Sequence, residues 1–160
     1  MREWLTDFRQ TIESATECLL RFDEAESSRP QAEGKWSAKE VMGHLIDSAA
    51  NNHARFVLAQ LRDDLVFPGY EQNRWVEVQH YREASWPQLV DLWRAYNLHL
   101  LHIISVTPDD KLKNFCYQHT MHEIAWKTFS KSEPVNLEQL MRDYVAHLKH
   151  HLGQVLGEPA

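Results

Sequence analysis

Apolar residues recur at spacings of three and four along four long stretches of this sequence, and no other pattern restricts its fold as strongly. The first stretch covers roughly residues 3–25, and the others begin near residues 38, 86 and 136. Each stretch repeats at the period of an amphipathic helix, which buries one face against its neighbours. Four long helices within 160 residues predict an all-α fold, a four-helix bundle.

Local signals mark where three of these helices begin. Ser37 is followed three residues later by Glu40, and Asn136 by Gln139, in the pattern of a capping box. In that motif the two side chains accept hydrogen bonds from backbone amides that the first helical turn leaves free. Pro87 suits the first turn of the third helix, because proline lacks the amide that would be unpaired there. These signals predict well-defined N-terminal ends for the second, third and fourth helices.

Two stretches between the long helices lack such a clear pattern. Residues 70–84 carry a few apolar residues at helical spacing, which predicts a short extra helix packed on the body of the bundle. Residues 113–135 show no clear period, which predicts a long connection before the last helix, with an extended piece at 115–118. Connections of that length are often functional or enclose a site. We expect residues 1–160 to form one domain.

The charge and the cysteine content exclude several classes of protein. The net charge is −6, from 23 acidic and 17 basic residues, which disfavours binding to nucleic acid. Cys18 and Cys116 are too few for a disulfide framework or a thiolate metal cluster, which fits a reducing compartment. Residues 1–7 show no secretory signal pattern, and no stretch approaches the roughly 20 apolar residues of a membrane span. We expect a cytoplasmic protein that does not bind membranes.

Two histidines four residues apart, His147 and His151, interrupt the apolar pattern of the last helix. An advance of about 100° per residue places both at one edge of the apolar arc, whereas His150 falls opposite its centre. Positions i and i+4 share one face of a helix, so both imidazoles can reach one metal ion. The alternative is that both are histidines at the edge of the core, each hydrogen-bonded to a neighbour.

A catalytic metal site usually has three protein ligands and one open position for water or substrate. The second long helix offers two candidates for the third ligand, His44 and His53. Because nine residues separate them, which is about 13 Å along the helix axis, they cannot bind the same ion. His53 falls within the apolar arc and His44 beyond its edge, so the pattern alone favours His53 as the inward residue.

Three segments together carry a resemblance to a known family. They are residues 36–48, WSAKEVMGHLIDS, residues 74–76, RWV, and residues 147–155, HLKHHLGQV. With these segments the sequence resembles the DinB-like/YfiT-like superfamily of metalloenzymes, and the resemblance covers nearly the whole chain. It implies a bundle with the helix order up-down-down-up that holds one divalent metal ion on three histidines.

The family motif assigns the three ligands to His44, His147 and His151. His44 follows the Trp-Ser-x-x-Glu-x-x-x-His pattern and the other two form the His-x-x-x-His pair, so the resemblance overrides the preference for His53. Zn or Ni is the best candidate for the metal, and Fe or Mn are further candidates. Members commonly dimerise, and some resemble thiol S-transferases that use bacillithiol, mycothiol or glutathione. The resemblance therefore implies a homodimer with a small-molecule substrate and a low-molecular-weight thiol as a candidate partner.

A three-histidine site with an open position can act as a Lewis acid, which lowers the pKa of a bound water or thiol. We therefore expect a metal-dependent enzyme of the hydrolase or thiol S-transferase type. The alternative is a non-catalytic bundle in which a metal joins the last helix to the second, and which acts through dimerisation or stress-related binding.

Asp47, three residues after His44, is the candidate catalytic residue. Its carboxylate is suited to act as a base, or to hold the second nitrogen of a ligating histidine. The alternative is a solvated carboxylate on the helix surface. Gln154, near the end of the last helix, is a second candidate for supporting a ligand.

Overall fold

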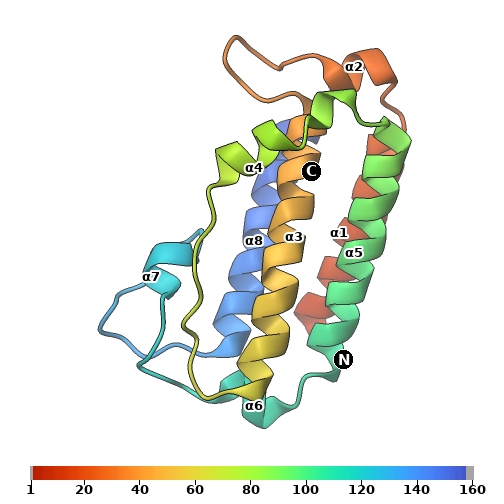
Figure 1. The fold of residues 1–160 in the computed structure, drawn as a ribbon. Helices are drawn as coiled ribbons and strands as arrows, with labels where there is room; N and C mark the ends of the chain where they lie inside the picture. The colour runs from red at the N-terminus through yellow and green to blue at the C-terminus, as the bar shows by residue number, and fades with distance from the viewer. Residues whose placement is uncertain (1, 158–160) are drawn as a thin grey trace.

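The computed structural model describes residues 2–157, and its regular elements there are all helices. The ends of the predicted domain, residue 1 and residues 158–160, lie outside the described part. The prediction of an all-α four-helix bundle is confirmed (Figure 1). The long helices are α1 (Glu3–Leu19), α3 (Ala38–Leu61), α5 (Trp86–Val106) and α8 (Leu137–Leu156).

The four long helices run up, down, down and up in chain order (Figure 1). Helix α3 contacts both α5 and α8, and α1 contacts the same two helices. Helices α3 and α5 point the same way, so the chain must return along the length of the bundle between them (Figure 1). That return, residues 62–85, carries α4 (Gln72–Val78) and the short 3-10 helix η1 (Tyr81–Glu83). The predicted extra helix within residues 70–84 is therefore present.

The first helix is shorter than predicted, because it ends at Leu19 rather than near residue 25. Asp23 begins a separate helix, α2 (Glu24–Ser28), and forms a capping box with Glu26. Phe22 lies in the turn between the two helices, and its ring stacks on Trp86 with 6.0 Å between centroids. The apolar spacing continues past the end of α1 because Phe22, although it lies in the turn, still packs against the core.

The predicted long connection before α8 holds two short helices, α6 (Asp109–Lys113) at its start and α7 (Met121–Ile124) within it. The predicted extended piece at 115–118 takes part in a backbone bridge between Cys116 and Val135. The next residues pair with the return segment, since the Leu65 amide donates to the carbonyl of Gln118 at 2.9 Å. The two long connections are thus joined beside the bundle.

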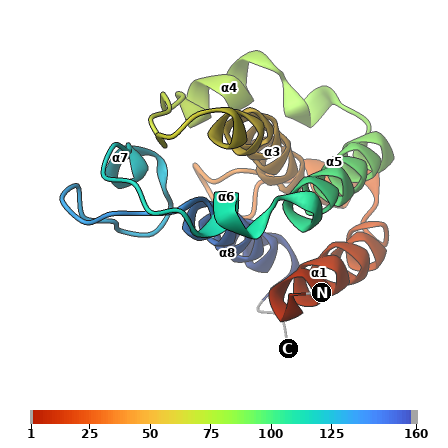
Figure 2. The ribbon, with the colours of Figure 1, turned by 90° about the horizontal axis from the view of Figure 1, so that it is seen from below.

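The N-terminal half of α3 is buried on every side, from residue 41 to residue 49. Figure 2 shows why, because the segment with α4 lies on the side of α3 that faces away from α1. The segment approaches so closely at Gly43 that an added Cβ atom would lie only 2.1 Å from Cδ2 of the Tyr81 ring. A helix covered on all faces has no solvent side, and a helical wheel that assumes one misplaces its polar residues.

Candidate metal centre

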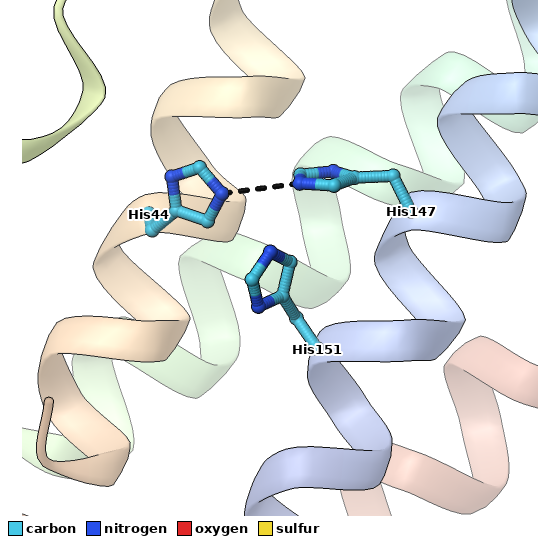
Figure 3. Close-up of side chains that lie close together, drawn as sticks. All are labelled: His44, His147 and His151. Carbon is cyan, nitrogen blue, oxygen red and sulfur yellow. Dashed lines mark hydrogen bonds between the residues drawn. The ribbon is translucent and has the colours of Figure 1, made fainter. Parts of the chain in front are cut away.

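Three imidazoles converge between α3 and α8. His44 comes from α3, and His147 and His151 come from successive turns of α8 (Figure 3). Each offers a ring nitrogen, and the three nitrogens lie within 4.8 Å of one another. His44 is 1% exposed, whereas the other two are half-buried. The structure thus brings together the three predicted ligand residues, and His150 lies on the exposed side as the wheel predicted.

The spacing of the nitrogens fits a small tetrahedral ion. Nε2 of His44 and Nε2 of His147 lie 3.2 Å apart (Figure 3). Two nitrogens bound at about 2.0–2.1 Å to the same tetrahedral zinc ion would be separated by about 3.3 Å. The two helices therefore already hold these two atoms at the separation that a shared ion requires.

Burial keeps the histidines in the neutral form that binds metals. Burial, and then the nearby charge of His151, lowers the pKa of His44 to about 4. Burial, followed by the charges of the neighbouring histidines, lowers the pKa of His147 to about 3. Burial also lowers the pKa of His151, although its hydrogen bond to Gln154 opposes this. All three rings are therefore neutral near pH 7 and offer a lone pair.

Gln154 sets the tautomer of His151. The Nδ1–H of His151 donates to Oε1 of Gln154 at 2.8 Å, which leaves Nε2 as the free acceptor. The amide of Gln154 lies 3.3 Å from Nε2 of His150, and its backbone carbonyl accepts from Gln31 at 2.6 Å. The supporting role predicted for Gln154 thus has a direct structural basis.

The tautomer of His44 also suits a metal ligand. Nδ1 of His44 and Oδ2 of Asp47 are buried without a hydrogen-bond partner in the described part of the chain. With Nε2 of His44 directed at His147, the ring proton belongs on Nδ1, as in a histidine that binds a metal through Nε2. The chemistry of the donor set and the nitrogen separation both suit a divalent transition metal.

Asp47 is buried, with 3% of its surface exposed, so the alternative of a solvated carboxylate is wrong. Its Oδ1 accepts hydrogen bonds from the Tyr81 hydroxyl at 2.6 Å and from Nε2 of Gln79 at 2.8 Å. Burial raises the pKa of the Asp47 carboxyl, while these two bonds oppose the rise. The carboxylate is thus held by the return segment rather than by a ligand histidine, and its catalytic role stays a prediction.

The preference of the helical wheel for His53 is wrong. His53 is half-buried near the other end of α3, where its Nδ1 lies 3.3 Å from the Tyr96 hydroxyl and its ring contacts His99. Both of these partners belong to α5. His44 is the inward residue because α8, α4 and η1 enclose the half of α3 that carries it.

A cleft of about 280 Å³ opens beside the centre, and His147 and His151 are part of its wall. The return segment and the connection that carries α7 form its other sides. Asp143 holds that connection in place, because its two oxygens accept from the amides of Trp126 and Lys127 at 2.8 Å each. The remaining lining is mostly polar: Ser48, Asn52, Arg55, Tyr70, Gln72, Glu123, Ile124, Ala125, Trp126, Leu140 and Tyr144.

The sequence analysis missed Arg55, Tyr70 and Asp143 as residues of the site. Helical spacing held a signal for two of them. Arg55 follows His44 by eleven residues, close to three full turns, and Asp143 precedes His147 by four, so each shares a face with a ligand. Tyr70 comes from the irregular return segment, where no periodicity indicates which way a side chain points.

Comparison with known proteins agrees with this geometry. Residues 5–155 match the family model described as the DinB superfamily. The chain belongs to the DinB superfamily. As a DinB-superfamily member it is similar in fold to a solved structure titled "YfiT from Bacillus subtilis is a probable metal-dependent hydrolase with an unusual four-helix bundle topology". The two share 21% identity with a TM-score of 0.74, over 97% of this chain and 85% of the other.

Relatives of this DinB-superfamily chain are also named as metal-dependent hydrolases. A protein of Bacillus cereus (strain 03BB102) named "Putative metal-dependent hydrolase" is 22% identical over 154 residues, 95% of this chain and 81% of the relative. A Bacillus anthracis (strain A0248) protein of the same name is 21% identical over the same shares. Among residues 2–157, His44, His147 and His151 are the one group that could hold a metal ion. None of the helices described there meets the length and apolar character of a membrane span.

Proposed function

We propose that this chain is a metal-dependent hydrolase that binds one divalent transition metal ion through His44, His147 and His151. The convergence of three neutral imidazoles beside an open cleft carries this proposal. The names of the relatives support the same reaction class. Zinc and nickel suit the all-nitrogen donor set best, and iron and manganese are further candidates.

Three protein ligands leave a coordination position for water or substrate. His147 and His151 line the cleft, so an ion held by them would be within reach of a molecule bound there. When bound, the ion would supply Lewis acidity, which favours the ionised form of water near neutral pH and polarises a carbonyl or phosphoryl group. The residues of the chain orient the ligands and exclude bulk water from the buried side of the site, where His44 lies.

The cleft suits a small molecule rather than a polymer, because its volume is about 280 Å³ and residues of the return segment and of the connection with α7 line it. Both segments contribute polar residues to its lining, namely Tyr70, Gln72 and Glu123. Asp47 lies one turn from His44, and burial raises the pKa of its carboxyl, which makes the carboxylate a stronger proton acceptor. We therefore retain Asp47 as the proposed proton acceptor.

Elemental analysis of protein purified without a histidine tag tests the proposal at its first step. We expect about one equivalent of a transition metal, and a higher melting temperature after zinc or nickel is added to stripped protein. A protein that neither contains metal nor is stabilised by it would contradict the proposal.

A panel of small esters, amides and phosphoesters tests the reaction class. We expect the metal-loaded protein to hydrolyse at least one class, and stripped protein to be inactive. Assays with bacillithiol, mycothiol and glutathione distinguish hydrolysis from transfer to a thiol, since a transferase consumes substrate only when the thiol is present. If metal raises stability without turnover in any of these assays, the non-catalytic bundle is the better description.

Size-exclusion chromatography of the same samples tests the expected homodimer.

A further inference from the structure

Arg55 is a buried cation without an acidic partner. Its side chain is 6% exposed, and Nη2 donates to the carbonyl of Pro68 at 3.0 Å. No carboxylate within residues 2–157 forms an ion pair with it. Burial lowers the pKa of this guanidinium, yet arginine stays charged in proteins. A buried charge is costly unless an opposite charge or several hydrogen bonds compensate it.

Arg55 lines the same cleft as His147 and His151. It lies about 16 Å beyond His44 along the axis of α3, on the same face. The Cα–Cβ bonds of a helix tilt toward its N-terminus, so the side chain of Arg55 leaves the helix on the side of the metal centre. The cleft thus has a cation toward one end and the metal ligands toward the other.

Other charged and titratable groups of the cleft do not neutralise Arg55. Both oxygens of Asp143 are taken by the amides of Trp126 and Lys127. Glu123 is 66% exposed at the rim and lies 3.2 Å from His122. Burial raises the pKa of the Tyr70 hydroxyl to about 12, so this group stays a neutral donor near pH 7. Asn52 and Ser48 are neutral and bond to each other.

We propose that Arg55 binds an oxyanion, a carboxylate or a phosphate, carried by the substrate at the end of the cleft away from the reacting bond. The planar guanidinium offers paired donors that match either group, and within residues 2–157 the Pro68 carbonyl is its one hydrogen-bond acceptor. That the bound anion is part of a substrate rests on the proposed hydrolase function, whereas the anion site itself does not. The substrate class is then small anionic esters, amides or phosphoesters.

Calorimetric titration with benzoate, phenylphosphonate and the neutral analogue benzamide tests this site in the metal-loaded protein. We expect an anion to bind wild type more tightly than benzamide does, and the better of the two anions identifies the group as carboxylate or phosphate. Arg55→Met should weaken anion binding by about tenfold or more, as expected for a lost charged hydrogen-bonding partner. Arg55→Lys keeps the charge but not the paired donors, so its anion affinity should lie between those of wild type and Arg55→Met.

Two controls make the result specific. Arg9→Met removes the same charge from an exposed position on α1 and should leave anion affinity unchanged. His44→Ala removes a proposed metal ligand that does not line the cleft. If anion binding persists in His44→Ala and is lost in the double variant with Arg55→Met, the anion binds to the arginine and not to the metal. Equal anion affinity in wild type and in folded Arg55→Met and Arg55→Lys would overturn the inference. If wild type neither contains metal nor is stabilised by added zinc or nickel, Arg55-dependent anion binding would uphold the anion site although the hydrolase is refuted.

Discussion

Nε2 of His44 and Nε2 of His147 lie 3.2 Å apart, although 103 residues separate them in the chain. The contact exists because α3 and α8 are antiparallel neighbours, so the first third of one helix meets the middle of the other (Figures 1 and 3). The residues between them include α5 and both long connections. The candidate metal centre is therefore a product of the bundle topology and not of any one segment.

The first prediction concerns the ligands themselves. We expect His44→Ala or His147→Ala to reduce bound metal from about one equivalent to near zero, because two imidazoles hold an ion far more weakly than three. His150→Ala is the matched control, since His150 is exposed on the same helix. Elemental analysis and circular dichroism of the same samples separate loss of metal from loss of fold. Full metal content in both ligand variants would show that the site lies elsewhere.

Gln154 supports His151, so its removal should weaken metal binding while the ligands remain. Loss of a residue that holds a metal-bound histidine typically costs about 10–100-fold in metal affinity. We expect that loss for Gln154→Ala, and recovery of most of it for Gln154→Glu, which keeps an acceptor for Nδ1–H of His151. Competition with a chelator of known affinity measures the difference. Equal affinities in all three proteins would mean that the bond has no role in holding the metal.

Asp47→Asn tests the proposed proton acceptor. Asparagine keeps the oxygen that accepts from Tyr81 and Gln79, so the fold and the metal content should be preserved. If Asp47 accepts a proton in the reaction, turnover should fall by about 10²–10⁴-fold. Tyr81→Phe is the control, since it removes a hydrogen bond to Asp47 without removing the charge. Unchanged turnover in Asp47→Asn would assign this carboxylate to structure alone.

Gly43→Ala tests the packing of the return segment on α3. Alanine normally stabilises a helix relative to glycine by about 1 kcal/mol. Here the added Cβ would overlap the Tyr81 ring, and overpacking of this kind costs about 1–3 kcal/mol. We expect a net loss of stability in urea unfolding and a disturbed bond between Tyr81 and Asp47. Gly69→Ala has open space around its Cβ and should be near neutral.

The ion pair of Lys39 with Glu24 should make stability depend on pH in the acid range. Lys39 is buried, with its Nζ 2.5 Å from the Glu24 carboxylate, and their hydrogen bond lowers the pKa of Glu24 from its ordinary value of 4.5. A lowered acid pKa in the folded state contributes stability above pH 4.5 that is lost as the pH falls. Glu24→Gln should flatten the acid limb of the stability curve, whereas Glu33→Gln, at an exposed position, should leave it unchanged. The same acid limb in both variants would contradict this role.

Local signals in the sequence were enough to locate the long helices. The capping boxes at Ser37 and Asn136 are present in the structure, and the helices begin one residue later. The inward direction of His147 and His151 also followed from periodicity, because α8 keeps one exposed face and a wheel describes it well. A helix of that kind carries its orientation in its own pattern of apolar and polar residues.

The third ligand and the substrate cleft depended on contacts between distant segments. His44 lies off the apolar arc of α3 but is buried, because the return segment covers the side that a wheel assigns to solvent. Arg55 and Asp143 likewise become part of one cleft only when α3 and α8 are antiparallel. Periodicity along one helix records which face is apolar, but which neighbour covers each face is decided by the packing of the whole bundle.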